Sequence, residues 1–261
     1  PHGYDIVDHA AINSEIGTLD ALRSLRSALR EHDMGLIADV VPNHMSNSAQ
    51  LNAWWLDVLE NGPSSPYASY FDIDWMPLKP DLAYKVLLPV LGDQFGKVLE
   101  AGQLVVRYES GSFRLEYFEQ RFPLAPRSYT TILSPRLEEL RQQLGEQHPD
   151  ALEFMSILTA VKNLPPQTET DVERLAERRR EKEIIKRRLH DLVDRSSAVA
   201  EFVVENVRRV NGDPGHPRSF DRLDELLRNQ AYRLEYWRVA ADEINYRRFF
   251  DINELAAICT E

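Results

Sequence analysis

Residues 35–44 have the sequence GLIADVVPNH, which carries the strongest fold signal in this chain of 261 residues. The run from Leu36 to Val41 is apolar except for Asp39, and a glycine and a proline bound it. Such a run is typical of a strand buried on both faces of a parallel sheet. Leucines recur at helical spacing over residues 19–29, just before it. A helix followed by such a strand predicts half of a β/α repeat.

One acid interrupts this apolar strand. An ionised Asp39 buried among apolar side chains is costly unless a cation pairs with it, which predicts an arginine on a neighbouring strand. Asn43 and His44 follow the carboxyl end of the strand, where β/α barrels place their active sites. We therefore expect His44 to face the mouth of a site. A helix-capping asparagine and a structural histidine are the alternative interpretation of the pair.

A second polar cluster lies near the start of the sequence. Two histidines and two aspartates fall within eight residues, beside an aromatic ring: His2, Tyr4, Asp5, Asp8 and His9. Histidines and carboxylates bind metals, but this spacing matches no metal motif, so we predict no metal and no cofactor. The cluster suits a sugar better, because an aromatic ring covers the apolar face of a pyranose and carboxylates bind its hydroxyls.

The middle of the chain changes character. Alternating apolar and polar residues predict a β-hairpin over residues 104–117, with its turn at residues 110–112. A short helix is expected over residues 52–59, and an aromatic-rich block extends from it to residue 75. Aromatic rings dominate cores, so core packing is the first interpretation of this block. A row of sugar-stacking platforms along a groove is the alternative.

The third part of the chain is predicted to be helical. Apolar residues three or four apart mark helices over residues 135–147, 150–161, 170–195, 197–210 and 221–229. The stretch 171–195 is dense in both signs of charge. This mixture favours a solvated helix face, laced with ion pairs at three and four residues, over a binding patch.

The overall composition excludes some classes of partner. Lysine and arginine number 31 and aspartate and glutamate 42, which gives a formal net charge of −11. Phosphate binding needs a net basic face, so we expect no nucleic-acid partner. No apolar run approaches the roughly 20 residues of a membrane span, so no membrane partner is expected. The single cysteine, Cys259, fits a reducing compartment and predicts a cytoplasmic location.

Retaining glycosidic chemistry needs two carboxyl groups roughly 5 Å apart, one as nucleophile and one as acid/base. The segment 242–254 offers four acids around a pair of arginines: Asp242, Glu243, Asp251 and Glu254. Nothing in their spacing decides among them. Their spacing alone therefore leaves the choice of a catalytic pair open.

Taken together, these residues resemble the α-amylase superfamily. The resemblance rests on HGYDIVDH at residues 2–9, followed by Asn13 and Glu15, and on DVVPNH at residues 39–44. Within the superfamily, the chain is similar to the family of maltooligosyltrehalose synthases. That similarity rests on further motifs, which are WWLDVLE at 54–60, FDIDW at 71–75, KVLLPVLG at 85–92, RFPLAP at 121–126 and YWRVAADEINYRRFFD at 236–251.

The resemblance implies an α/β fold, a partial (β/α)8 TIM barrel of the α-amylase type with a long mixed hairpin and helical insertion. It implies four segments, which are a partial catalytic barrel over 1–60, an insertion with the β-hairpin over 61–134, a helical insertion over 135–230 and a return segment toward the barrel over 231–261. In the family the nucleophile lies on the next barrel strand. We therefore expect an internal fragment that lacks the catalytic carboxylates, is inactive alone and tends to associate.

The implied activity is an isomerase reaction, an intramolecular transglucosylation with retention. The α-1,4 bond at the reducing end of a maltooligosaccharide becomes an α,α-1,1 trehalose bond, because the released glucose and not water attacks the glycosyl-enzyme. By resemblance, Tyr4, Asp5, Asn43 and His44 bind the substrate and Asp39 orients an active-site arginine. The implied partners are the maltooligosaccharide and the rest of the parent barrel. An α-glucan hydrolase of the same superfamily and a non-catalytic glucan-binding module remain as alternatives.

Overall fold

The computed structural model describes residues 3–48, 51–240, 243–250 and 252–259 of the chain. Its helices in these ranges are α1 (Leu19–Glu31), α2 (Ala53–Asn61), α3 (Phe95–Glu100), α4 (Tyr129–Leu133), α5 (Leu137–Leu144), α6 (Pro149–Asn163), α7 (Val172–Arg195), α8 (Ser197–Val210), α9 (Asp221–Arg228) and α10 (Trp237–Ala240). Its strands are β1 (His44–Ser46), β2 (Val86–Leu91), β3 (Leu104–Glu109), β4 (Ser112–Tyr117), β5 (Gln120–Pro123), β6 (Tyr232–Tyr236) and β7 (Leu255–Ala257).

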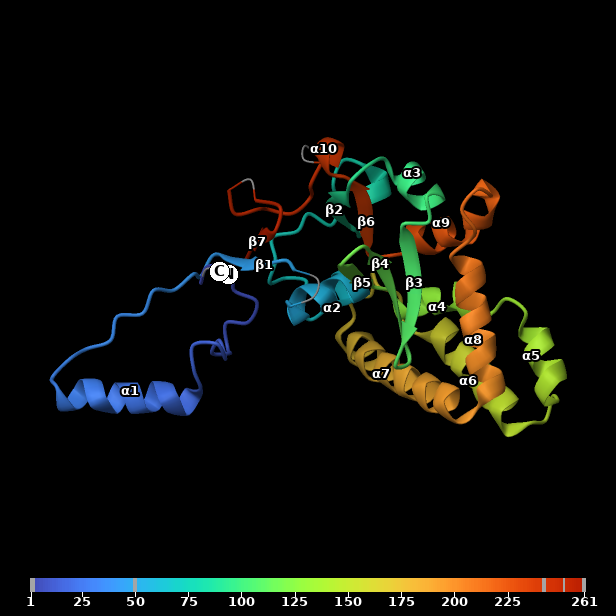
Figure 1. The fold of residues 1–261 in the computed structure, drawn as a ribbon, viewed down its shortest axis with the longest axis horizontal. Helices are drawn as coiled ribbons and strands as arrows, with labels where there is room; N and C mark the ends of the chain where they lie inside the picture. Colours follow the sequence, from blue (N-terminus) through green and yellow to red (C-terminus); the bar gives the residue numbers. More distant parts are fainter. Residues whose placement is uncertain (1–2, 49–50, 241–242, 251, 260–261) are drawn as a thin grey trace.

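The strands form three small sheets. The antiparallel order β3-β4-β5 confirms the predicted hairpin and adds β5, which the alternation pattern did not indicate. The other two sheets join distant parts of the chain, since β2 runs parallel to β6 and β1 runs antiparallel to β7. Residues near 45 and 90 therefore lie beside residues near 255 and 235, and this places the first and last parts of the chain together (Figure 1).

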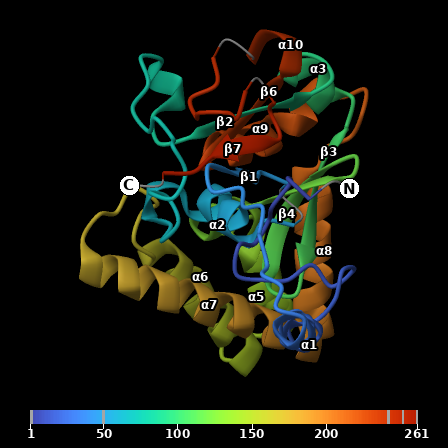
Figure 2. The same cartoon turned by 90° about the vertical axis from the view of Figure 1, so that its left-hand side faces the viewer.

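The core lies between the hairpin sheet and a layer of helices. Helix α7 packs on α6 and α8, and both α7 and α8 contact the hairpin strands (Figure 2). The inward residues of β3 and β4 alternate with exposed or half-buried ones, as in a sheet with one covered face. The helices predicted over residues 135–229 are confirmed with shifts of a few residues at their ends. So is α2, whose cap Asn52 accepts hydrogen bonds from the Trp54 and Trp55 amides.

The aromatic block of residues 54–75 is packed internally, as its first interpretation predicted. The rings of Trp54 and Tyr67 stack, with centroids 5.4 Å apart. Trp55 is buried and meets the edges of the Phe71 and Tyr246 rings. Through these contacts the block packs α2 against the segment that precedes β7. This packing positions Trp55 and Tyr246, which line the cleft described below.

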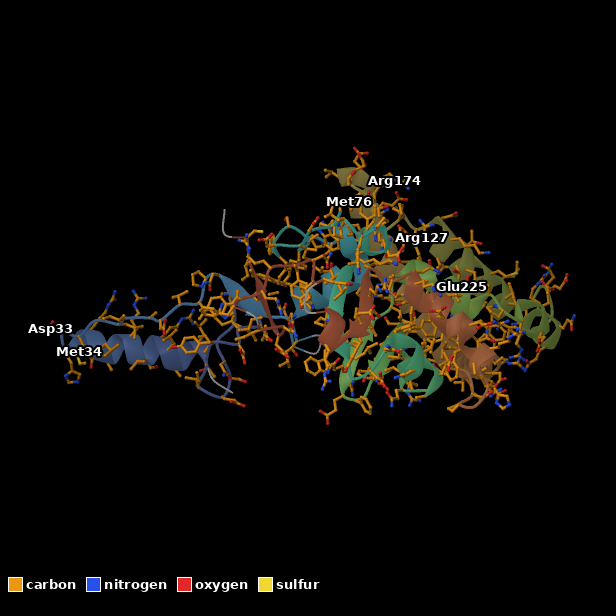
Figure 3. The ribbon with its side chains drawn as sticks, turned by 90° about the horizontal axis from the view of Figure 1, so that it is seen from above. Asp33, Met34, Met76, Arg127, Arg174 and Glu225 are labelled. Atoms are coloured by element: carbon orange, nitrogen blue, oxygen red, sulfur yellow. The ribbon has the colours of Figure 1, made fainter. Side chains whose placement is uncertain are left out.

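The first helix and the strand predicted after it depart from expectation. Helix α1 forms, and its cap Thr18 accepts a hydrogen bond from the Ala21 amide, but none of its residues is buried. Figures 1 and 3 show α1 apart from the body. Residues 36–41 form no strand, and Ile37 is 97% exposed. A parallel strand needs neighbours for its backbone hydrogen bonds, and no described strand lies beside this run.

Helix α7 also corrects an expectation. The charged stretch was predicted to be a solvated face, yet Arg178 and Lys182 are buried. The Lys182 Nζ lies 2.9 Å from Glu60 Oε2 and 3.1 Å from Asp57 Oδ2. On its second oxygen, Glu60 accepts a hydrogen bond from Lys186 at 2.5 Å. One face of this charged helix is therefore held against α2 by buried ion pairs, because both acids belong to α2.

Candidate functional site

The predicted histidine lies on β1, and three contacts fix its ring. His44 is buried, and its ring stacks on Phe249 with centroids 4.0 Å apart and an interplanar angle of 19°. Its Nδ1 lies 2.9 Å from Asn43 Oδ1, and its Nε2 lies 3.2 Å from the carbonyl oxygen of Tyr4. Pairing of His44 with Ala257 across β1 and β7 holds the backbone. The structure thus joins three of the predicted site residues.

Tyr4 also contacts Asp39. The Tyr4 hydroxyl donates a hydrogen bond to Asp39 Oδ2 at 3.1 Å. Tyr4 is 53% exposed and the Asp39 side chain lies in solvent, so the expectation of a buried Asp39 paired with an arginine is wrong. The expected arginine was placed on a neighbouring strand, and the run that carries Asp39 forms no strand in the described chain. The hydrogen bond and charge of Asp39 raise the pKa of Tyr4 above its ordinary value of 10.0.

This contact predicts a measurable titration. Replacing Asp39 with asparagine removes the negative charge that resists ionisation of the phenol. The pKa of Tyr4 should therefore fall back toward 10.0 in Asp39→Asn. The measurement is the carbon resonance of the Tyr4 ring followed against pH by NMR, with Tyr4→Phe to assign the signal. An unchanged midpoint in Asp39→Asn would show that the two side chains do not meet in solution.

A cleft of about 600 Å³ opens beside β1. It is lined by aromatic and polar side chains from five parts of the chain, among them Asp5, Asn47, Arg121, Trp237, Tyr246 and Glu254. Trp237, at the start of α10, is 49% exposed and presents ring surface to solvent. Ligand pockets of this size commonly combine apolar walls with a few convergent polar groups. The cleft therefore has the size and chemistry for a small polar ligand with apolar faces.

Buried and partly buried hydrogen bonds hold the wall of the cleft. Asn47 Nδ2 donates to the carbonyl oxygen of Asn253 at 2.6 Å, and the Tyr246 hydroxyl donates to the same oxygen at 3.2 Å. Asn52 Nδ2 donates to the carbonyl oxygen of Ser46 at 2.7 Å. Burial raises the pKa of Tyr246, so its phenol stays protonated as a donor at neutral pH. These bonds join β1, α2 and the segment before β7 into a rigid wall.

The structure divides the predicted site residues into two groups. Asp5 lines the cleft, whereas Tyr4, Asp39, Asn43 and His44 form the hydrogen-bonded group next to it. His44 is covered by Phe249 and is not among the residues that line the cleft, although Ser46 of the same strand is. Three residues considered from sequence lie outside the described ranges: His2, Asp242 and Asp251.

Sequence reasoning missed several residues of the cleft. Trp237 and Tyr246 lie in the motif at residues 236–251, and Arg121 begins the motif at residues 121–126, yet neither motif was assigned to a site. Their spacing gives no signal, because more than a hundred residues separate Arg121 from Trp237. Tertiary packing brings them together, since the Phe122 ring of β5 contacts the Tyr232 ring of β6. Within the described residues, no cluster of three histidine, cysteine, aspartate or glutamate side chains could hold a metal ion.

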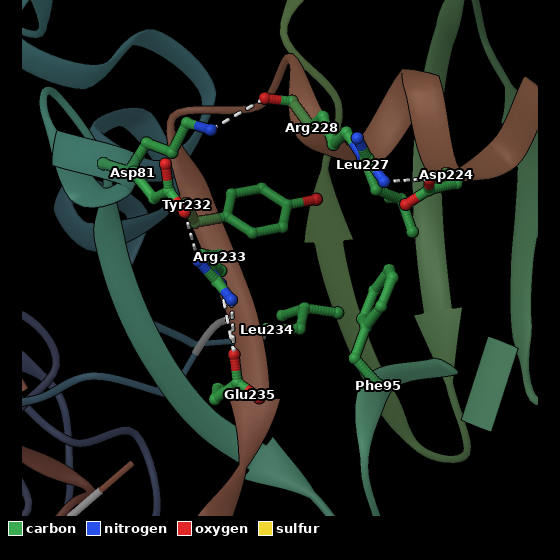
Figure 4. Close-up of a pocket in the computed structure, with 10 residues that line it drawn as sticks. Asp81, Phe95, Asp224, Leu227, Arg228, Tyr232, Arg233, Leu234 and Glu235 are labelled. Atoms are coloured by element: carbon green, nitrogen blue, oxygen red, sulfur yellow. Dashed lines mark hydrogen bonds and ion pairs between the residues drawn. The ribbon is translucent and has the colours of Figure 1, made fainter. Parts of the chain in front are cut away.

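A second cavity of about 460 Å³ lies beside β6 and α9 (Figure 4). Its charged side chains pair with one another, with Arg233 3.1 Å from Glu235 and Arg228 2.6 Å from Asp224. Lys85 Nζ donates to the carbonyl oxygen of Arg228 at 2.8 Å. Because these charges are already compensated, the lining selects neither an anion nor a cation.

The first part of the chain matches a family model. Residues 1–99, which include β1, Asp5 and the group around His44, match the family model described as the alpha amylase catalytic domain. This match confirms the resemblance to the α-amylase superfamily. The fold class is confirmed as well, an α/β chain that corresponds to part of an α-amylase-type barrel with hairpin and helical insertions.

Within that superfamily the chain is similar to maltooligosyltrehalose synthases. A Mycobacterium tuberculosis protein provisionally named maltooligosyl trehalose synthase is 40% identical over 121 residues, which covers 42% of this chain and 15% of the relative. The solved maltooligosyltrehalose synthase of Arthrobacter ramosus superposes with a TM-score of 0.53 at 27% identity, covering 98% of this chain and 21% of that one. An intracellular maltogenic amylase of Bacillus subtilis is 32% identical over 80 residues, which covers 31% of this chain and 13% of the relative.

These comparisons also fix the extent of the likeness. The chain spans between about an eighth and a fifth of the length of these relatives. In the part that the structure describes, no helix is both long and apolar enough to cross a membrane.

Proposed function

We propose that this chain forms part of an isomerase that converts the reducing-end α-1,4 bond of a maltooligosaccharide into an α,α-1,1 trehalose bond. The observation that carries the proposal is the cleft of about 600 Å³ beside β1, where aromatic rings and hydrogen-bonding side chains converge. Similarity to relatives named maltooligosyltrehalose synthase supports the choice of substrate and reaction.

The lining of the cleft suits a chain of glucose units. The half-exposed Trp237 ring offers a platform for the apolar face of a pyranose. Asp5 and Glu254 accept hydrogen bonds from sugar hydroxyls, and Arg121 donates to sugar oxygens. Such a site binds an uncharged polyol through many weak polar contacts and one stacking surface.

The hydrogen-bonded group next to the cleft takes a supporting role in this proposal. Tyr4, Asn43 and His44 bind the sugar at the point of cleavage together with Asp5, and Asp39 orients this end of the site through the Tyr4 hydroxyl. The ring of His44, stacked on Phe249, is held in one orientation. Because the Phe249 ring covers the His44 ring, Phe249 must move away before His44 can contact a substrate.

The reaction follows a retaining course. A carboxylate displaces the glucose at the reducing end, and that glucose, turned within the pocket, attacks the glycosyl-enzyme through its own anomeric hydroxyl. Exclusion of water distinguishes this isomerase from the hydrolase alternative. The two carboxylates belong to the rest of the parent barrel, and residues 1–60 contribute one part of that barrel. The insertions at 61–134 and 135–230 and the return segment at 231–261 complete the proposed organisation.

The proposed compartment is the cytoplasm. Cys259 is a free thiol and is exposed. An exposed free thiol persists where cellular reductants keep it reduced, which supports a reducing compartment.

The test uses maltopentaose. The longer enzyme that carries this segment should remove reducing ends without releasing free glucose, whereas a hydrolase would increase the number of reducing ends. The 261-residue chain alone should bind maltopentaose and leave it unchanged, because it lacks the carboxylate pair. Reducing-sugar assay and calorimetric titration measure the two properties.

A matched pair of variants locates the binding. Trp237→Ala should weaken maltopentaose binding by about tenfold. This is at the lower end of the effect of losing a stacked nucleic-acid base, about 1–3 kcal/mol, because a pyranose stacks with its C–H face and not with a second aromatic ring. Tyr84→Ala removes an aromatic ring of similar exposure that lies outside both the cleft lining and the aromatic block, and it should leave the affinity unchanged. Equal losses of affinity in both variants would show that the cleft is not the binding site. Conversion of maltopentaose by the 261-residue chain alone would contradict the proposal that the catalytic carboxylates lie outside it.

A further inference from the structure

A pocket on the helical side of the molecule carries a charge pattern unlike that of the cleft. It has a volume of about 370 Å³ and lies between the turn before α4, the segment that joins α6 to α7, and the end of α9. Its lining includes Arg127, Arg178 and the hydroxyl residues Thr130 and Thr131. Among the described residues that line it, no side chain is acidic. The pocket is therefore one-sidedly cationic in a chain whose net charge is negative.

The inner wall of the pocket includes Arg178, and only some of its N–H groups have hydrogen-bond acceptors. Arg178 is 1% exposed. Its Nη1 donates to the carbonyl oxygen of Pro165, and its Nη2 lies 3.4 Å from Asn61 Oδ1. Its Nε is buried and has no hydrogen-bond partner in the described part of the chain. A buried donor without an acceptor is unfavourable, so this guanidinium favours a ligand that brings one.

Charge compensation at this arginine is also incomplete. No carboxylate of the described residues forms an ion pair with the guanidinium of Arg178 or Arg127, in contrast to the neighbouring Lys182. Burial lowers the pKa of Arg178 to about 10. The negative charge of Glu60 raises this pKa but does not cancel the effect of burial, and the positive charge of Arg127 lowers it further. The side chain is nonetheless charged at neutral pH. Two arginines thus face one pocket with an excess of positive charge.

We propose that this pocket binds a phosphate group, either as inorganic phosphate or on a small phosphorylated sugar. Guanidinium groups match the geometry of phosphate oxygens and form strong charge-assisted hydrogen bonds with them. Arg127, which also lines the pocket, is exposed and would donate to the anion from the solvent side. Thr131 offers a hydroxyl donor from α4. The volume exceeds that of one phosphate, which leaves room for an organic group.

The site lies apart from the proposed glucan cleft. The two sets of lining residues do not overlap. Phosphate binding is therefore expected to be independent of maltopentaose, and either proposal can fail without the other.

The experiment titrates the 261-residue chain with inorganic phosphate and, separately, with glucose 6-phosphate, at constant ionic strength in chloride. Saturable binding is expected, with Arg127→Ala and Thr131→Val weakening it, the first by at least tenfold. Arg179→Ala is the matched control, because Arg179 is an exposed arginine of the neighbouring helix α7 that does not line the pocket. The affinity of this control should match that of the parent chain.

The two ligands distinguish the source of the phosphate. Binding of glucose 6-phosphate at least tenfold tighter than inorganic phosphate would indicate a phosphorylated sugar, and equal affinities would indicate the free anion. Arg178→Met can unfold the chain because the residue is buried, so the test relies on Arg127 and Thr131. Absence of saturable binding at millimolar concentration, or equal weakening in Arg127→Ala and Arg179→Ala, would overturn the proposal.

Discussion

Replacing Glu60 with glutamine should lower the free energy of unfolding by about 3–5 kcal/mol, the usual cost of removing one partner from a buried ion pair. Glu60 is buried at the end of α2, 2.9 Å from Lys182 Nζ and 2.5 Å from Lys186 Nζ. Glutamine keeps the volume of the side chain but removes its charge. Two ammonium groups then remain at the interface of α2 and α7. Asp57 stays 3.1 Å from Lys182 Nζ, and the exposed Glu183 lies 3.8 Å from Lys182 Nζ and 3.7 Å from Lys186 Nζ.

The same contact predicts how stability depends on pH. Burial by itself raises the pKa of Glu60, but the charges of Lys186 and Lys182 outweigh it and lower the pKa below the ordinary value of 4.5. A carboxyl with a lowered pKa stabilises the folded state fully above its unfolded pKa. This contribution should be lost as the pH falls below 4.5 through the folded value. The loss should be absent in Glu60→Gln.

Urea unfolding followed by circular dichroism measures both effects. The matched control is Glu205→Gln, because Glu205 also pairs with two cations, Arg208 and Arg209, but does so at the surface. Exposed ion pairs contribute little, so this variant should unfold close to the parent midpoint. Similar midpoints for Glu60→Gln and the parent chain would show that α7 does not pack on α2 as described.

Local patterns predicted most of the helical part and the hairpin. Periodicity over residues 150–161 and 197–210 is sufficient for α6 and α8, because each helix makes its own backbone hydrogen bonds. The alternation over residues 104–117 is likewise enough for β3 and β4, which are joined by a turn of two residues. Elements whose partners lie close in sequence are therefore predictable here.

Local patterns did not predict the elements whose partners lie far away in the sequence. The parallel pair β2 and β6 joins Val86 to Tyr232, and nothing in either run indicates the other. The apolar run at residues 36–41 has the composition of a buried strand, but no described strand pairs with it. Most of its residues and the leucines of α1 therefore lie exposed. The sequence pattern indicates which secondary structure the residues favour. Whether that structure forms depends on partners elsewhere in the chain.

The candidate site shows the same division. The resemblance assigned Tyr4 and His44 to one substrate-binding site, and the structure places His44 Nε2 3.2 Å from the Tyr4 carbonyl oxygen, whereas their role in binding stays a prediction. The charged face of α7 was misjudged because composition alone does not show that Lys182 faces Glu60, 122 positions earlier. Long lysine and arginine side chains are usually solvated, and only tertiary packing identifies the few that are buried.

Replacing Gly111 with alanine should destabilise the chain by about 2–5 kcal/mol through two separate causes. Gly111 lies in the turn between β3 and β4 with φ +80°, a backbone conformation that alanine adopts at a cost of about 1–2 kcal/mol. A Cβ at this position would also overlap the carbonyl oxygen of Lys186 in α7 and lie 3.1 Å from the Cβ of His190. Because the Lys186 oxygen is a backbone atom, relief requires the hairpin to move away from the helix.

Gly145→Ala separates the two causes. Gly145 ends α5 with φ +96°, so alanine is strained there as well, but no atom lies within 4 Å of the added Cβ. The difference between the two variants in urea unfolding should therefore be the steric part, about 1–3 kcal/mol. Since Lys186 also pairs with Glu60, a hairpin displaced from α7 should weaken that ion pair, and Gly111→Ala combined with Glu60→Gln should cost less than the sum of the two. Equal losses in Gly111→Ala and Gly145→Ala would mean that the turn does not rest on α7 in solution.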